Sequence, residues 1–259
     1  MQIEFFKYQG TGNDFVMIDN RNNIFDKTNL KHVQQLCDRK FGIGADGLIL
    51  IEDLEDLHFN MIYFNADGSQ SFCGNGSRCA VAFAKYLGII EKQAMFLSTD
   101  GEHEAWINSQ GEVSLKMHDV TEIEKGEGHY FINTGSPHYI VNVDDVSAVD
   151  VKGAGSKVRY NERFKADGTN VNFVKFSDFE LDIRTYERGV EDETLSCGTG
   201  VTAAALSLAD AKGLQEGVIY VNAAGGNLKV GFKRNGNDFN DIWLIGPATF
   251  VYHGAIELS

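Results

Sequence analysis

The chain has 259 residues, of which 43% are hydrophobic and 23% are charged, and its formal net charge is −14. This length suits two domains of ordinary size, and the composition supports a sizeable core and excludes extensive disorder. The acidic balance argues against nucleic acid or an anionic membrane as a partner. No apolar run approaches a membrane span and the first residues lack a signal-peptide pattern, so we expect a cytoplasmic protein.

The four cysteines form no pattern typical of disulfides or of a zinc site. They are Cys37, Cys73, Cys79 and Cys197, and no Cys-x-x-Cys pair is present. A chain this long in a reducing compartment gains little from disulfides. Cys73 and Cys79 are six residues apart without a paired histidine, so we expect no metal site.

The first elements are predicted from apolar periodicity and turn residues. A strand pair surrounds the glycine-rich turn Gly10-Thr-Gly-Asn-Asp14. A helix over residues 28–40 follows, with Thr28 as its N-cap and Leu30, Val33 and Leu36 on its apolar face. Cys37 belongs to that face and is interpreted as a core residue. Short strands are expected at residues 48–51 and 57–65.

A second helix, over residues 75–87, is apolar almost all round and is therefore expected to be buried. Cys73 lies at its start, Cys79 packs inside it, and Gly88 ends it. Three strands follow, at residues 94–99, 102–108 and 112–118. The polar, acidic stretch 119–128 is the candidate domain boundary.

The second half repeats this plan, which indicates an ancient duplication. Strands are expected at residues 128–133, 139–143, 170–176 and 180–186, with helix and loop over 144–160. A second buried helix covers residues 198–212, with Cys197 at its start, and more strands close the sheet. Two similar halves favour a pseudo-twofold arrangement with the active site in the cleft between them.

Cys73 and Cys197 each begin a Cys-Gly-polar-Gly turn that opens an apolar helix. A helix N-terminus carries unpaired N–H groups and partial positive charge, so it lowers a thiol pKa and binds a carboxylate. If a substrate carboxylate sat between the two turns, one thiolate would remove the Cα proton and the other thiol would deliver one from behind. Such a pair would invert a stereocentre without a cofactor. The alternative is that both cysteines are small packing residues.

Several motifs together resemble the diaminopimelate epimerase family, which interconverts LL- and meso-diaminopimelate without a cofactor. The resemblance covers the whole chain and rests on Gly12-Asn-Asp-Phe15, Asn65-x-Asp-Gly-Ser with Cys73-Gly-Asn-Gly-x-Arg78, Tyr186-Glu-Arg-Gly189, Cys197-Gly-Thr-Gly200 and Val251-Tyr-His-Gly254. It implies an α/β fold of two pseudo-symmetric domains, each a barrel-like mixed sheet around a central buried helix. With the last strand returning to the first domain, the expected domains are residues 1–118 plus 248–259 and residues 119–247.

The resemblance also assigns roles. Cys73 would be the proton donor and Cys197 the acceptor in the LL-to-meso direction. His138 and Glu187 would tune the cysteines, and Tyr252 would lie at a homodimer contact. The residues that match substrate-binding positions are Asn13, Asn65, Gly74, Asn75, Asn170, Glu187, Arg188, Gly198 and Thr199. Arg188 suits bidentate pairing with the distal carboxylate.

Three positions depart from the family pattern. The run between Asn65 and Cys73 is one residue shorter, Gly47 replaces a frequent Gln, and Ser136 replaces a frequent Asn before Pro-His. These departures leave open a related racemase acting on another amino acid, such as histidine or a proline derivative. A thiol-based redox or binding protein that uses the Cys73/Cys197 pair is a third hypothesis.

Overall fold

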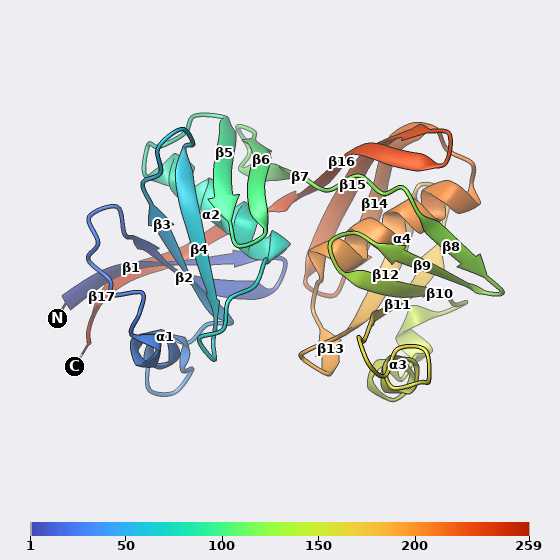
Figure 1. The fold of residues 1–259 in the computed structure, drawn as a ribbon, viewed down its shortest axis with the longest axis horizontal. Coiled ribbons are helices and arrows are strands. Elements are labelled where there is room, and N and C mark those ends of the chain that lie inside the picture. Colours follow the sequence, from blue (N-terminus) through green and yellow to red (C-terminus); the bar gives the residue numbers. More distant parts are fainter. Residues whose placement is uncertain (1, 259) are drawn as a thin grey trace. The chain divides into compact units, whose positions relative to one another are not determined.

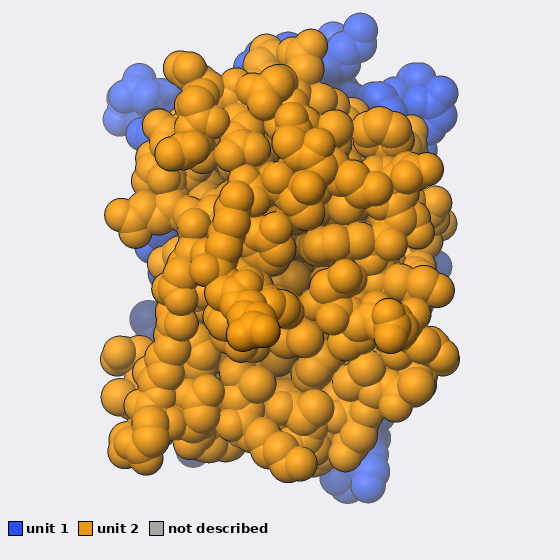
Figure 2. Space-filling model, turned by 90° about the vertical axis from the view of Figure 1, so that its right-hand side faces the viewer, with its two compact units in different colours: residues 1–115, 246–259 blue, residues 116–245 orange. Residues whose placement is uncertain are grey.

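The computed structural model describes residues 2–258 and divides the chain into two compact units (Figures 1 and 2). Unit 1 comprises residues 1–115 and 246–259, and unit 2 comprises residues 116–245. The sequence analysis expected these boundaries at 118/119 and 247/248. Strands β7 (Glu112–Lys116) and β16 (Asp238–Pro247) run through the two boundaries, so no loop marks either one in the sequence.

Unit 1 is built on a mixed sheet. Its strands, in spatial order, are β17 (Thr249–Glu257), β1 (Gln2–Gly10), β2 (Asn13–Asp19), β3 (Gly47–Glu52), β4 (Phe59–Asn65), β5 (Gln93–Ser98), β6 (Gly101–Ile107) and β7. The pairs β2/β3 and β4/β5 are parallel, and the other neighbours are antiparallel. Helix α1 (Leu30–Cys37) connects the first parallel pair and α2 (Gly74–Tyr86) the second, as parallel pairing requires a crossover.

Unit 2 repeats this arrangement. Its strands, in spatial order, are β8 (Ile123–Gly126), β9 (His129–Asn133), β10 (Pro137–Asn142), β11 (Asn170–Phe176), β12 (Glu180–Glu187), β14 (Glu216–Ala223), β15 (Gly226–Asn235) and β16, and the short β13 (Asp192–Thr194) also pairs with β12. The parallel pairs are β10/β11 and β12/β14. They are connected by α3 (Val151–Arg159), preceded by the short η1 (Val146–Ala148), and by α4 (Gly198–Ala211).

The two units therefore share one order of antiparallel and parallel pairs, and the predicted duplication is confirmed. The sheet of unit 1 surrounds α2, which packs against β1, β2, β3, β4 and β6 (Figure 1). Helix α4 packs in the same way against β9, β10, β11, β12, β14 and β15. Both helices are buried along most of their length, as their apolar sequences predicted.

Two local predictions at the start of α1 were wrong. Helix α1 begins at Leu30 after Asn29, and Thr28 instead donates its hydroxyl hydrogen to Asp26 Oδ1 at 2.7 Å. Leu30 is 44% exposed rather than part of the core, because a helix that starts later presents this residue at its open first turn. The acidic stretch 119–128, the candidate domain boundary, begins a few residues after the boundary between the units at 115/116 and contains β8 paired with β9.

Candidate active site

Cys73 and Cys197 occupy the same position in their units, namely the N-cap of the central helix. Both have extended backbone angles, φ −138° and ψ 109° for Cys73 and φ −122° and ψ 114° for Cys197. The Gly76 N–H donates to Cys73 Sγ at 3.4 Å, and Cys197 Sγ lies 3.4 Å from Thr199 Oγ1. Cys73 Sγ thus accepts from a first-turn N–H group, whereas Cys197 Sγ contacts a first-turn hydroxyl group, and both lie at the helix end that favours an anion.

The Cys73 site consists of Asn13, Asn65, Cys73, Gly74 and Asn75. Strand β2 begins at Asn13 and β4 ends at Asn65, and the register across β3 brings both strand ends to the start of α2. The Asn75 amide donates to Asn13 Oδ1 at 2.6 Å, and Asn13 Nδ2 donates to Asp46 Oδ2 at 3.0 Å. Asn13 is therefore held in one orientation from both sides.

The shortened segment before Cys73 is folded around Asn65. The Asn65 amide donates to Ser69 Oγ at 3.0 Å and to Ser71 Oγ at 3.2 Å. Phe72 stacks on His103, with ring centroids 4.6 Å apart and an interplanar angle of 8°. These contacts give the segment a defined path into the helix despite its missing residue.

Gly47 has no room for a side chain, because Tyr63 occupies that space. A Cβ atom on Gly47 would lie 2.4 Å from Tyr63 Cε2 and 2.5 Å from the Phe64 carbonyl oxygen. The Tyr63 hydroxyl donates to Asn65 Oδ1 at 3.0 Å. Tyr63 thus supplies a polar group at this position of the Cys73 site, and the sequence analysis missed it because the group comes from the neighbouring strand.

A charged cluster supports Asn13 from behind. Asp14 accepts from Lys7 Nζ at 2.7 Å and from Arg39 at 2.6 Å, and Arg39 also reaches Asp46 at 2.7 Å. Burial alone would raise the pKa of Asp14, but the hydrogen bonds and charges of Arg39 and Lys7 outweigh it and lower that pKa to about 2. Asp14 is therefore ionised throughout the neutral range.

Arg78 is fully buried on α2, below Cys73. Its Nη2 donates to Thr11 Oγ1 at 3.0 Å and its Nε to the Pro247 carbonyl at 3.4 Å, while Nη1 has no hydrogen-bond partner among the described residues. Burial lowers the pKa of Arg78, whereas the thiols of Cys79 and Cys73 act in the opposite direction. A buried cation without a carboxylate partner favours a neighbouring thiolate.

The Cys197 site consists of His138, Asn170, Glu187, Arg188, Cys197, Gly198 and Thr199. His138, the second residue of β10, pairs with Asn170, where β11 begins, and β12 ends at Glu187. Asn170 Oδ1 accepts from the Arg188 N–H at 2.8 Å, and Glu187 accepts from Thr194 Oγ1 at 2.8 Å. The Arg188 side chain is exposed and donates to the Asp167 carbonyl at 2.7 Å.

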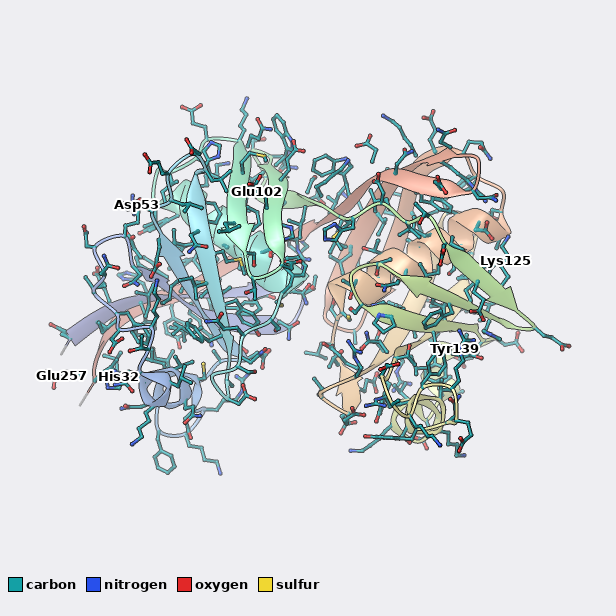
Figure 3. All side chains as sticks on the ribbon, in the orientation of Figure 1. His32, Asp53, Glu102, Lys125, Tyr139 and Glu257 are labelled. Atoms are coloured by element: carbon teal, nitrogen blue, oxygen red, sulfur yellow. The ribbon has the colours of Figure 1, made fainter. Side chains whose placement is uncertain are left out.

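His138 lies behind Thr199 and is fully buried, with its Nε2 2.9 Å from Thr199 Oγ1. Burial, and then the charge of Arg188, lowers the pKa of His138 to about 3, so the imidazole is neutral near pH 7. Ser136 Oγ lies 3.1 Å from the same Thr199 hydroxyl. The next residue on β10, Tyr139, points to the opposite face and stacks on His129 with centroids 4.5 Å apart (Figure 3).

The other cysteines and Tyr252 lie outside the two cysteine sites. Cys37 and Cys79 are buried, as expected, and burial raises the pKa of each thiol to about 12. Tyr252 lies on β17, is 42% exposed, and packs edge-on against Phe5 with centroids 5.9 Å apart. Within residues 2–258 we find no group of three or more His, Cys, Asp or Glu side chains that could hold a metal ion. No helix in this part of the chain is both long and apolar enough to span a bilayer.

Comparisons with known proteins match the chain over nearly its full length. The family model described as diaminopimelate epimerase matches residues 5–123 and 130–251. The diaminopimelate epimerase of Flavobacterium psychrophilum is 50% identical over 256 residues, covering 98% of this chain and 100% of that protein. The diaminopimelate epimerase of Chlorobaculum tepidum is 42% identical over 261 residues, covering 96% and 99%.

Among solved structures, a phenazine biosynthesis protein of the PhzF family from Bacillus anthracis shares the fold. Its TM-score is 0.77 at 13% sequence identity, and the match covers 100% of both chains. At this identity the likeness concerns the fold alone.

Proposed function

The chain belongs to the diaminopimelate epimerase family, and we propose that it interconverts LL- and meso-diaminopimelate by proton transfer at one α-carbon. The observation that carries this proposal is the pair of cysteines at matched helix N-termini of two repeated units. The product would serve the formation of lysine and of peptidoglycan precursors.

In the proposed reaction, Cys73 and Cys197 act on opposite faces of the same α-carbon. The Cys197 thiolate takes up the Cα proton, and the electron pair left on carbon delocalises into the substrate carboxylate. The Cys73 thiol then delivers its proton to the other face, which leaves a Cys197 thiol and a Cys73 thiolate. After the product leaves, proton exchange with water returns Cys197 to the thiolate and Cys73 to the thiol, and no cofactor takes part.

The backbone N–H groups of Gly74, Asn75, Gly198 and Thr199 would receive the carboxylate next to the reacting carbon, where negative charge develops. Asn13, Asn65 and Asn170 would position the substrate. Glu187 would pair with the distal ammonium group, and Arg188 would pair with the distal carboxylate. Each of these groups lies at the end of its unit where the central helix begins.

We further propose a cytoplasmic homodimer. Tyr252, with Phe250 and Val251, forms an exposed apolar run on β17, each residue 42–51% exposed. Burying such a run against a second copy would remove apolar surface from water. Light scattering of the purified protein should give the mass of a dimer, and Tyr252→Arg should shift it towards the monomer. A wild-type monomer at micromolar concentration would contradict this part of the proposal.

The substrate is tested with a panel of amino acids that includes LL-diaminopimelate, L-histidine, L-proline and trans-4-hydroxy-L-proline. Products are separated by chiral chromatography. Turnover of LL-diaminopimelate alone, together with its loss in Arg188→Gln, supports the proposal. Equal or faster turnover of a monocarboxylate would contradict it and would favour a racemase of another amino acid.

A further inference from the structure

A chain of buried neutral groups leads from the sheet of unit 2 to Cys197. Thr185 Oγ1 donates to Asn172 Oδ1 at 3.0 Å, and Asn172 Nδ2 lies 3.1 Å from His138 Nδ1. His138 Nε2 then meets Thr199 Oγ1 at 2.9 Å, and Thr199 Oγ1 meets Cys197 Sγ at 3.4 Å. The first three residues are 0–3% exposed, so these hydrogen bonds are shielded from water.

The chain has a direction. Because the Asn172 oxygen accepts from Thr185, its NH₂ group faces His138 and can only donate to Nδ1. A neutral imidazole with an acceptor at Nδ1 carries its hydrogen on Nε2. That hydrogen is donated to Thr199 Oγ1, so the hydroxyl hydrogen of Thr199 is left to point elsewhere.

The packing of α4 keeps this arrangement fixed. A Cβ atom on Gly200 would lie 2.6 Å from Asn172 Oδ1 and 3.1 Å from His138 Cε1. The first turn of α4 therefore lies directly on the amide–imidazole pair, and a glycine is the residue that permits this approach. The charge that acts on His138 is that of Arg188, which lies in the loop directly after β12.

The Thr199 hydroxyl hydrogen has two acceptors within reach, Cys197 Sγ at 3.4 Å and Ser136 Oγ at 3.1 Å. When Cys197 is a thiolate, Thr199 donates to sulfur and Ser136 donates to Thr199. When Cys197 is a thiol, its S–H donates to Thr199 and Thr199 donates to Ser136. The heavy atoms keep the same positions in both states and only the hydroxyl and thiol hydrogens reorient, so that in the thiol state the Ser136 hydroxyl hydrogen points away from Thr199.

We propose that Ser136 and Thr199 form a hydrogen-bond switch that serves both protonation states of Cys197. Asn172 is the positioning residue of this switch, because it holds His138 in the tautomer that donates to Thr199. The inference rests on the proposed function, in which Cys197 alternates between thiolate and thiol. It also gives the serine at position 136 a role at Cys197 rather than at the substrate.

The switch predicts shifts of opposite sign in two variants of the full-length protein. Thr199→Val removes the donor to the thiolate. The pH at which Cys197 becomes half-maximally reactive with iodoacetamide should therefore rise by about one unit, which corresponds to an about tenfold smaller fraction of thiolate at a fixed lower pH. Ser136→Ala removes the acceptor that the thiol state needs, so this pH should fall. The rate is measured by mass spectrometry of the Cys197 peptide, and the Cys73 peptide from the same sample is the internal control.

Asn172→Asp tests the tautomer with an almost isosteric side chain. A carboxylate accepts from Nδ1–H, so ¹⁵N NMR of labelled histidine should show the His138 hydrogen on Nε2 in the wild type and on Nδ1 in the variant. Cys197 should then lose reactivity about tenfold at pH 8, with Cys73 unchanged.

Three results would overturn the inference: an unchanged His138 tautomer in Asn172→Asp, shifts of the same sign in Ser136→Ala and Thr199→Val, or equal shifts at Cys73 and Cys197. These readouts need no substrate. If the wild type fails to epimerise LL-diaminopimelate while the shifts appear, the proposed function fails and the switch stands. If the wild type epimerises LL-diaminopimelate but the shifts do not appear, the switch fails and the proposed function stands.

Discussion

The Cys73 site and the Cys197 site have the same backbone plan but opposite electrostatic surroundings. Around Cys73 the groups are charged: Arg78 is a buried cation, and Asp14 is held by Lys7 and Arg39. Around Cys197 the hydrogen-bonded groups are neutral, namely a histidine with its pKa lowered to about 3, an amide and three hydroxyl groups, while the charged Glu187 and Arg188 of that site are half-buried and exposed. A duplicated scaffold can therefore place two thiols alike and still stabilise their thiolates by different means, a charge in one unit and oriented hydrogen bonds in the other.

The largest effect concerns what the two sites have in common. Cys73→Ala and Cys197→Ala should each lower kcat about 10²–10⁴-fold in both reaction directions, because each thiol is the acid in one direction and the base in the other. Circular dichroism detection of epimerisation measures this, with Cys37→Ala as a control outside the site. Near-wild-type turnover in either site variant would contradict the two-cysteine mechanism, since one cysteine would then suffice.

The charged surroundings of Cys73 are tested by Asp14→Asn. This change leaves the almost buried Lys7 without its carboxylate partner. We expect a loss of about 2 kcal/mol of unfolding free energy at pH 7, below the ~3–5 kcal/mol of a fully buried pair because Asp14 remains partly exposed. Urea unfolding measures it.

The Asp14 effect should depend on pH. The folded pKa of about 2 lies below the unfolded value, so the stabilisation is present above pH ~4 and is lost as the pH falls towards 2. The exposed pair of Arg163 and Glu124 in unit 2, at 2.7 Å, serves as the control, and Glu124→Gln should leave the unfolding free energy nearly unchanged because solvent screens this pair. Equal losses in the two variants would contradict the account.

The buried histidine near Cys197 should lower the free energy of unfolding in a different pH range. The unfolded chain binds a proton at His138 below pH ~6.5, whereas the folded protein does so only near pH 3. Stability from this histidine is therefore present above pH ~6.5 and declines by about 1.4 kcal/mol per pH unit as the pH falls. His138→Gln should flatten the slope of unfolding free energy between pH 6.5 and 5, and an unchanged slope would show that His138 titrates normally.

The smallest expected effect is on KM and tests the role of Tyr63. Tyr63→Phe keeps the ring over Gly47 and removes one hydrogen bond to Asn65. A single neutral hydrogen bond is worth about 1 kcal/mol, so KM should rise about fivefold with little change in kcat. Steady-state kinetics distinguishes this from a purely structural role, which would lower stability and leave KM as it is.

The sequence predicted the repeat, the two buried helices and both cysteines because these features are local: apolar periodicity and a Cys-Gly-polar-Gly turn are visible in short windows. It missed Tyr63, Arg78 and Thr11 as partners, since their contacts join residues brought together only by strand register and helix packing. Asn172 had a usable signal, because it follows Asn170 by two residues and so shares its face of β11. The prediction of Thr28 as the helix N-cap was wrong, because the Thr28 hydroxyl group instead hydrogen-bonds to Asp26 in the preceding turn.

The central claim is that two thiols exchange protons with one α-carbon, and incubation with LL-diaminopimelate in deuterated water tests it most directly. The account predicts meso product that carries deuterium at one α-carbon only, detected by NMR and mass spectrometry, and product formation at least about 10²-fold slower in Cys73→Ala and in Cys197→Ala. The contradicting result is that the wild-type protein yields neither exchange nor meso-diaminopimelate.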